Sequence, residues 1–339
     1  MEERNLEKIN SLFKAKFSVE ALKFRELNAH ASKRSMVRIF HPNNISYIGV
    51  YNENQKENLA FISFAKTFKK IGLNVPEIIA EDLTNNVYLQ QDLGDQTLRS
   101  LLDTTKSETD IFPSNIKAFY KKALTELVKF QVLGGEKIDY EYCEIHQEYS
   151  KPSMLFDMNY FKKEFLLRHE IKFDETLLEE SFDNFTKFLL RAPIKHFCYR
   201  DFQARNIMII NDGLFFIDFQ GGRKGAIYWD LVSLLYQSSA EIPQGCRDEL
   251  TEHYANELSK IEKVNFHEFK ILTEAFVLIR MLQVLGAYGR HGLGEGKEYF
   301  LKSIPFALEN VNRLFINQSF PDDCKELKKV LEKLISLYL

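Results

Sequence analysis

One short stretch of the chain carries polar side chains at spacings that suit phosphate chemistry. From Tyr199 to Phe219 it reads Tyr-Arg-Asp-Phe-Gln-Ala-Arg-Asn-Ile-Met-Ile-Ile-Asn-Asp-Gly-Leu-Phe-Phe-Ile-Asp-Phe. Two apolar runs flank Asn-Asp-Gly, which is a strong signal for a β-hairpin. Asn206 lies six residues before Asp212, and Asp218 lies six residues after it. Because residues equidistant from the turn face each other, about 5 Å apart at Cβ, we expect Asn206 and Asp218 to converge at the open end of the hairpin.

These side chains have the chemistry that a phosphoryl-transfer site requires. An amide oxygen and a carboxylate suit a hard cation such as Mg²⁺, whose remaining ligands are phosphates and water. Asp201 lies five residues before Asn206, and its carboxylate can accept the proton of an attacking hydroxyl group. A base and two metal-holding side chains are the minimum set for phosphoryl transfer. The Asp-x-x-x-x-Asn pattern alone more often marks a turn, but the symmetric placement of Asp218 favours the functional interpretation.

The same residues carry a family resemblance. The stretch resembles the catalytic loop and metal-binding segment of the protein-kinase-like superfamily, in its aminoglycoside phosphotransferase branch. The resemblance implies that Asp201 is the catalytic base, that Asn206 and Asp218 hold Mg²⁺, and that ATP is the phosphate donor. The chain is also similar to the anomeric N-acetylhexosamine kinases of bacterial cell-wall recycling at Arg200-Asp201 with Arg205-Asn206, at Asp218-Phe219-Gln220, at Asp230–Leu235 and at Asp92–Asp95.

The nucleotide side of the site departs from the family pattern. The strand that should carry a phosphate-binding lysine reads Ile-Ser-Tyr-Ile-Gly-Val-Tyr at residues 45–51, and the catalytic loop begins with Tyr199 where the family commonly has His. The nearest basic residues are Lys33, Arg34 and Arg38, close to a glycine-free turn that occupies the place of the phosphate-covering loop. We expect these three residues to contact the triphosphate. A solvated turn is the competing interpretation for Lys33 and Arg34.

Three further residues flank the expected site. Arg205 lies between the base and the metal ligand, where it either neutralises phosphate charge or pairs with Asp218. By the closer resemblance, Glu164 lies on the substrate-side helix and accepts hydrogen bonds from sugar hydroxyls, whereas most such glutamates face solvent. Arg223 follows the metal-binding aspartate and either meets an anionic substrate group or faces water.

Two other segments have roles that the resemblance implies. At the hinge, Gln91 and Leu93 are expected to contact the nucleotide. Asp230 opens an apolar helix after Trp229, a position where the helix N-terminus favours an acid. Its family analogue holds the backbone of the catalytic loop, so both interpretations of Asp230 are structural.

The surrounding pattern predicts an α+β, protein-kinase-like fold of two lobes. Residues 1–93 would form a small, β-rich, nucleotide-binding lobe that ends in the hinge, and residues 94–339 a larger, mainly helical lobe with the catalytic loop and substrate site. Apolar periodicity and turn signals predict the elements. The strands are Val19–Leu27, Met36–Phe40, Ile45–Tyr51, Glu77–Glu81 and Val87–Gln91, and the helices are Leu6–Phe17, Lys56–Ile71, Asn115–Leu133, Asn159–His169, Glu175–Arg191, Tyr228–Ser238, Arg247–Lys260, His267–Tyr288, Lys297–Phe315 and Asp322–Tyr338.

Bulk properties exclude several classes of function. The chain has 339 residues, is 45% hydrophobic and carries a formal net charge of -3, which argues against a nucleic-acid surface. It contains no apolar run of about eighteen residues and no signal peptide, so we expect a cytoplasmic protein without a membrane span. Its four cysteines and eight histidines show no metal-ligand spacing. The expected partner is therefore a small molecule, and the sequence leaves the oligomeric state open.

The sequence favours an ATP- and Mg²⁺-dependent kinase that acts on a sugar hydroxyl. By resemblance, the acceptor is the anomeric hydroxyl of N-acetylglucosamine or N-acetylmuramate. One alternative keeps the fold and changes the acceptor to an aminoglycoside or a choline-like alcohol. Another is a nucleotide-binding pseudokinase, which the missing lysine and Tyr199 favour and the intact Asp201 opposes.

Overall fold

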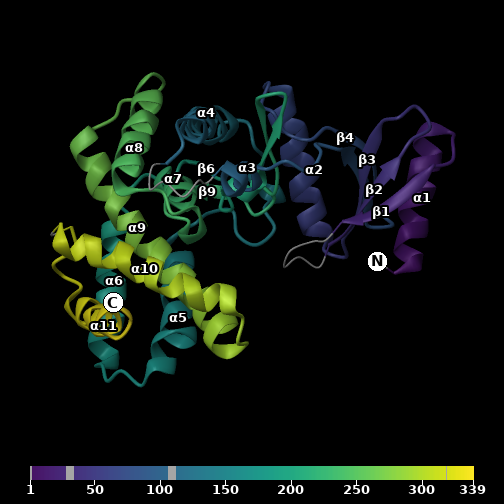
Figure 1. Ribbon diagram of the computed structural model, residues 1–339. Coiled ribbons are helices and arrows are strands. Elements are labelled where there is room, and N and C mark those ends of the chain that lie inside the picture. Colours follow the sequence, from purple (N-terminus) through teal and green to yellow (C-terminus); the bar gives the residue numbers. More distant parts are fainter. Residues whose placement is uncertain (1, 28–33, 106–111, 318) are drawn as a thin grey trace.

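The N-lobe is built on one antiparallel sheet. The computed structural model describes residues 2–27, 34–105, 112–317 and 319–339. The sheet has five strands in the order β1-β2-β3-β5-β4, which confirms the predicted β-rich first lobe (Figure 1). The strands are β1 Lys23–Leu27, β2 Ser35–Phe40, β3 Ser46–Tyr51, β4 Ile78–Asp82 and β5 Val87–Gln91.

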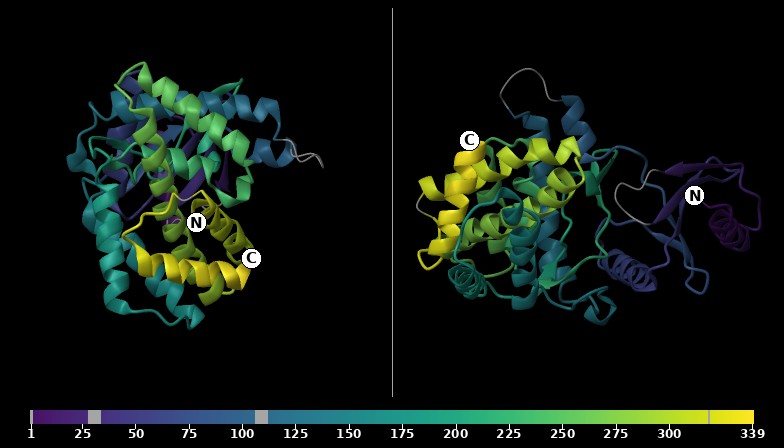
Figure 2. Two further views of the ribbon diagram at one scale, coloured as in Figure 1. Left: turned by 90° about the vertical axis from the view of Figure 1, so that its left-hand side faces the viewer. Right: turned by 90° about the horizontal axis from the view of Figure 1, so that it is seen from below.

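Two helices cover the two faces of this sheet. Helix α1, Glu3–Phe17, lies on the outer face, and α2, Gln55–Lys70, lies between the sheet and the rest of the molecule (Figures 1 and 2). A Cβ atom at Gly49 of β3 would lie 2.3 Å from Cγ2 of Ile9, so the close approach of α1 requires glycine there. The next residue, Val50, packs with α2 in the larger core. Strand alternation thus commits β3 to apolar packing on both faces.

The C-lobe is mainly helical, as predicted. Two features differ from the expectation: α3 was not predicted, and α5 begins at Lys151 instead of Asn159. Pro152 in the first turn of α5 marks this earlier start, because proline is favoured there. The remaining helices are α3 Leu98–Thr105, α4 Ser114–Lys129, α5 Lys151–Glu164, α6 Glu175–Leu189, α7 Tyr228–Leu235, α8 Gln244–Ser259, α9 Phe266–Tyr288, α10 Glu298–Ile316 and α11 Lys325–Tyr338.

The predicted hairpin forms, but its register differs by one residue from the expectation. Strand β7, Ile207–Ile210, pairs with β8, Gly213–Phe216, across a turn made by Asn211 and Asp212. Both turn residues have left-handed φ, 47° and 62°, as a two-residue hairpin turn of this type requires. The ladder places Asn206 opposite Ile217, not opposite Asp218, and Ile217 N donates to Asn206 O at 3.1 Å.

One helix of the described residues is long and apolar enough to span a membrane. It comprises α9 and the π-helical turn η6, Gly289–Gly294, and 61% of its most apolar window is buried inside the protein. It contacts α5, α7 and α10. Helix α9 therefore packs as a core helix of the C-lobe.

Candidate active site

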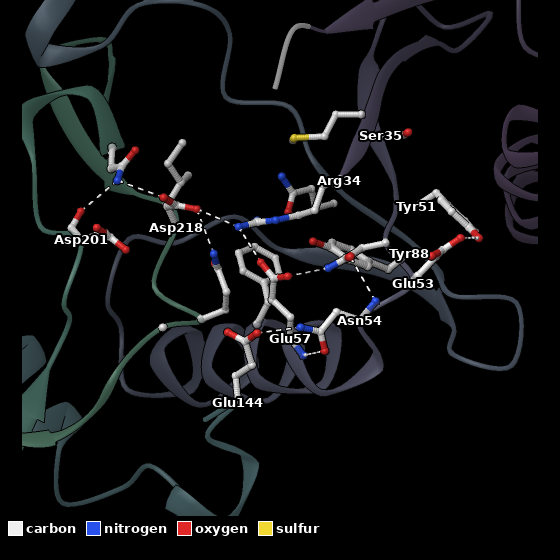
Figure 3. A pocket seen from close by; sticks show the side chains of 18 of the residues that line it. Arg34, Ser35, Tyr51, Glu53, Asn54, Glu57, Tyr88, Glu144, Asp201 and Asp218 are labelled. Carbon is white, nitrogen blue, oxygen red and sulfur yellow. Dashed lines mark hydrogen bonds and ion pairs between the residues drawn. The ribbon is translucent and has the colours of Figure 1, made fainter. Parts of the chain in front are cut away.

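A cleft of about 1160 Å³ lies between the two lobes. Side chains from both lobes line it, and Figure 3 shows those from the N-lobe facing the Asp201 and Asp218 carboxylates across the opening. From the predicted site, the lining includes Arg34, Asp201, Arg205, Asn206, Asp218 and Arg223.

The three predicted catalytic and metal-holding residues converge on the C-lobe wall of this cleft. Asn206 Nδ2 donates to Asp201 O at 2.9 Å and to Asp218 Oδ2 at 3.2 Å. Asp218 has a left-handed φ of 69°, and this turn of the backbone directs its carboxylate to Asn206 despite the shifted register. Burial raises the pKa of the Asp201 carboxyl above its ordinary value, and the nearby negative charge of Asp218 adds to the rise.

A buried carboxylate holds the backbone of the catalytic loop. Asp230 is fully buried and accepts hydrogen bonds from the backbone N of Tyr199 at 2.8 Å and of Arg200 at 2.9 Å. Gln131 Nε2 donates a third at 3.0 Å. Burial raises the pKa of Asp230 to about 6, although these donors oppose the rise. The left-handed φ of 74° at Arg200 is a strained conformation that this network maintains.

The aromatic residue at the start of the loop braces it against the metal-binding segment. Tyr199 is completely buried, and its hydroxyl donates to Ile217 O at 2.6 Å. On the other side, the ring of Phe219 stacks on Phe61 of α2 with centroids 4.9 Å apart and planes 5° from parallel. Tyr199 therefore links the catalytic loop to the metal-binding segment, and Phe219 links that segment to α2.

Arg34 brings a cation from the N-lobe to the predicted metal-binding carboxylate. Its Nη2 lies 2.8 Å from Glu57 Oε1 and 3.0 Å from Asp218 Oδ1. Glu57 lies in the first turn of α2 and was not predicted. The signal that could have identified it is the acidic residue at the start of the helix that follows β3. Lys33, the other predicted cation of this turn, lies outside the described residues.

Arg38 does not reach the cleft, contrary to the sequence-based expectation. Its side chain is 7% exposed, and its Nε lies 2.5 Å from Asp92 Oδ2 while its Nη2 lies 2.8 Å from Asp95 Oδ1. Gly94 O accepts another of its hydrogen bonds. Hinge residues thus surround the buried guanidinium, and Arg38 does not line the cleft.

The hinge residues themselves are displaced from the cleft. Leu93 is buried and the Gln91 side chain accepts from Glu77 N, and neither residue lines the cleft. The side chains on the cleft side of β5 are Tyr88 and Gln90. Gln90 Oε1 is buried without a hydrogen-bond partner in the described part of the chain. The period of two along β5 could have identified this pair.

The predicted substrate-side residues separate into two groups. Arg205 is exposed in the cleft lining, and Arg223 is buried there with its guanidinium on Gly221 O. Burial, together with the positive charge of Arg200, lowers the pKa of Arg223. Glu164 does not line the cleft, because it pairs with Arg168 at 2.8 Å on the far end of α5.

The residues at the metal position fit a hard cation. Two acceptors hold the Nδ2 of Asn206, so its amide oxygen is left for a metal ion, and Asp218 adds a carboxylate. The described residues contain no group of three or more His, Cys, Asp or Glu side chains that could hold a metal. A Mg²⁺ ion here would therefore need phosphate oxygens and waters to complete its octahedral shell, which is its usual mode of binding.

Known proteins resemble this chain in sequence and in fold. A family model described as the phosphotransferase enzyme family matches residues 50–264. The chain is 28% identical over 261 residues to an N-acetylmuramate/N-acetylglucosamine kinase of Neisseria meningitidis serogroup B, covering 75% of this chain and 74% of that protein. A kinase of the same name from Pseudomonas aeruginosa is 24% identical over 260 residues, covering 74% and 71%.

A solved structure supports the same conclusion for the fold. Spectinomycin phosphotransferase, crystallised with ADP and spectinomycin, superposes with a TM-score of 0.59 at 13% identity, covering 93% of this chain and 98% of that one. This likeness confirms the predicted kinase-like fold.

Proposed function

The chain belongs to the phosphotransferase enzyme family and is a small-molecule kinase of that family, and from this premise we propose that it transfers the γ-phosphoryl group of ATP to a sugar. The proposed acceptor is the anomeric hydroxyl of N-acetylglucosamine or N-acetylmuramate. The curated relatives at 28% and 24% identity, which carry the names of both sugars, support this choice. The proposed site of action is the cytoplasm, with no nucleic-acid or membrane partner.

The convergence of Asp201, Asn206 and Asp218 is the observation that carries the kinase mechanism. In the proposed reaction the Asp201 carboxylate accepts the proton of the attacking hydroxyl as its oxygen bonds to the γ-phosphorus. The bond from that phosphorus to the bridging oxygen breaks, and ADP leaves. A raised pKa at Asp201 makes it a stronger base than an exposed aspartate. The anomeric hydroxyl is more acidic than the other hydroxyls of the sugar, so it is the one that this base deprotonates most easily.

Charged side chains of the cleft have proposed roles around the triphosphate. Mg²⁺ held by Asn206 and Asp218 would neutralise charge that develops on the phosphoryl oxygens. Arg34 and Arg205 are the proposed protein cations at the phosphates, since both line the cleft. Arg223 lies further along the same wall and is proposed to contact the acceptor.

The test follows both products of the reaction. The protein is incubated with ATP, Mg²⁺ and a panel of N-acetylglucosamine, N-acetylmuramate, an aminoglycoside and choline, and ADP release is measured beside the loss of sugar reducing ends. Phosphorylation at C1 locks the ring, so we expect equal amounts of ADP and of lost reducing ends with an N-acetylated hexosamine. Asp201→Asn is the matched control for contaminating kinases.

Two results would reject parts of the proposal. ADP release with all reducing ends retained would mean that another hydroxyl is phosphorylated. Turnover with the aminoglycoside or choline, and none with either hexosamine, would reject the sugar acceptor and leave the kinase activity standing.

A further inference from the structure

The carboxylate proposed to hold the metal already accepts hydrogen bonds from three protein side chains. Asp218 Oδ1 accepts from Arg34 Nη2 at 3.0 Å and from Gln220 Nε2 at 2.9 Å, and Oδ2 accepts from Asn206 Nδ2 at 3.2 Å. Only Arg34 among these donors carries a charge. Figure 3 shows its guanidinium between Asp218 and Glu57, within the cleft. A cation that binds Asp218 must therefore compete with Arg34.

The local charge balance explains why a cation is held there. Asp201 and Asp218 from the C-lobe and Glu57 from α2 of the N-lobe bring three negative charges to the lining of the cleft. The side chains of Arg34, Asp218 and Glu57 are only 14%, 30% and 19% exposed, so water screens their charges incompletely. Arg34 compensates two of the three carboxylates at once.

We propose that Arg34 is a built-in counter-cation, which occupies Asp218 before substrate binds and passes to the triphosphate when the metal–nucleotide complex takes that carboxylate. Divalent metal replaces the arginine charge at Asp218, and the phosphates supply Arg34 with new negative partners. The charges of Asp218 and Arg34 are thus compensated both before and after binding. Guanidinium suits this exchange, because it has five donors and accepts phosphate and carboxylate partners equally well.

Glu57 is the positioning residue in this exchange. It pairs with the same Nη2 atom as Asp218 does, so it can keep Arg34 over the cleft after the bond to Asp218 breaks. The stacked rings of Phe61 and Phe219 fix α2 against the metal-binding segment. This contact keeps Glu57 within reach of Arg34 in both arrangements.

The experiment measures metal binding by the full chain without nucleotide or sugar. Mn²⁺ replaces Mg²⁺ because its bound and free forms are distinguished by electron paramagnetic resonance. Arg34→Ala removes the competing cation, so we expect it to bind Mn²⁺ about two- to fivefold more tightly than the wild type, the range of a partly screened ion pair. The same variant should bind Mn²⁺–ATP more weakly, since the triphosphate loses its partner.

Glu57→Gln should move free-metal binding in the opposite direction. It removes the carboxylate that shares Arg34, so Asp218 becomes the stronger partner of the arginine and Mn²⁺ alone should bind more weakly. Arg25→Ala is the matched control, because Arg25 is an N-lobe arginine that pairs with Asp95 and not with the metal carboxylate. The double variant Arg34→Ala, Asp218→Ala should lose the affinity that the single variant gains, which locates the metal at Asp218.

The opposite signs make the proposal falsifiable. If Arg34→Ala leaves the affinity for Mn²⁺ alone unchanged or weakens it, Arg34 does not occupy Asp218 in solution and the exchange is rejected. If Arg34→Ala and Arg25→Ala change the affinity for Mn²⁺ equally, the change follows from the lost net charge alone and the exchange is rejected. Thermal melting of every variant verifies that it is folded. The result does not depend on the acceptor, so failure of the sugar assay leaves this test intact.

Discussion

The two walls of the cleft are held by different kinds of interaction. On the C-lobe wall, the completely buried Asp230 accepts hydrogen bonds from the backbone of Tyr199 and Arg200. On the N-lobe wall, Arg34 reaches across the cleft through ion pairs that are partly exposed. Buried backbone hydrogen bonds are costly to break, whereas an ion pair that opens onto a cleft can exchange one negative partner for another. The difference indicates that the backbone of the loop that carries Asp201 is fixed in advance and that Arg34 is adjustable.

The largest effect is expected at the C-lobe wall, from Asp201, the proposed catalytic base. Asp201→Asn keeps the shape of the side chain and removes its ability to accept a proton. We expect kcat to fall about 10²- to 10⁴-fold, with the melting temperature and nucleotide affinity close to those of the wild type. Steady-state kinetics and isothermal titration with ADP measure the two quantities. Wild-type turnover would remove Asp201 from the role of base.

The second-largest effect is expected from Asp230, which holds the backbone of the catalytic loop. Asp230→Ala removes the acceptor of two backbone N–H groups of the catalytic loop and one of the two acceptors of the Gln131 amide. We expect the free energy of unfolding to fall by about 3 kcal/mol, measured by urea denaturation, and activity to fall with it. Asp248→Ala, at an exposed site on α8, is the control. An equal and small change in both variants would mean that the two walls do not differ as described.

Substitution of Arg34 on the N-lobe wall should change the affinity for ATP more than the stability of the protein. Arg34→Ala is expected to raise the KM for ATP about tenfold, equivalent to about 1.4 kcal/mol, with little change in melting temperature. Arg38→Ala removes the cation that the hinge carboxylates surround, so it should lower the melting temperature with a smaller change in KM. Kinetics and thermal melting of both variants test this contrast. The reverse pattern would return Arg38 to the phosphate site.

Asp230 on the C-lobe wall also predicts a pH dependence of stability. The pKa of Asp230 is about 6 in the folded protein, against about 3.9 in an unfolded chain. The folded state holds this proton more tightly than the unfolded chain does. Protonation of Asp230 therefore stabilises the folded protein fully below the unfolded pKa, and this stabilisation is lost as pH rises through about 6. Relative to Asp230→Asn, the free energy of unfolding of the wild type should rise by about 1 kcal/mol when the pH is lowered from 8 to 5. Urea denaturation at both pH values measures it, and a constant difference would contradict the raised pKa.

The smallest effect is expected outside both walls. Glu164 pairs with Arg168 and does not line the cleft, so Glu164→Gln should change the KM for the acceptor less than about twofold, as expected for a surface ion pair. Acceptor titrations at saturating ATP measure this. A tenfold rise in KM would restore the substrate role that the sequence suggested.

Local features of the sequence were sufficient to predict the catalytic wall. The turn signal at Asn-Asp-Gly and the flanking apolar runs specified the hairpin, and Asn206 and Asp218 meet as expected. The error of one residue arose because the signal locates a turn without stating which two residues occupy it. Asn211 and Asp212 take the left-handed conformations, and the positive φ of Asp218 then restores the convergence.

Partners far apart in the chain were not predictable from the same signals. Arg34 and Arg38 lie four residues apart and looked alike as basic residues near the expected phosphates. Their separation by role depends on carboxylates that the fold supplies: Asp218, 184 positions from Arg34, and Asp92, 54 positions from Arg38.

The sequence by itself determined the strands of the first lobe, most helices of the second and the residues of the catalytic loop, because these depend on periodicity and on contacts within a short segment. Only the tertiary structure decided which cation faces the cleft, that Glu57 and Gln90 line it, and that Glu164 does not. An ion pair forms where two charged groups come within a few ångströms of each other, and for distant residues that distance is set by the packing of sheet, α2 and C-lobe around the cleft.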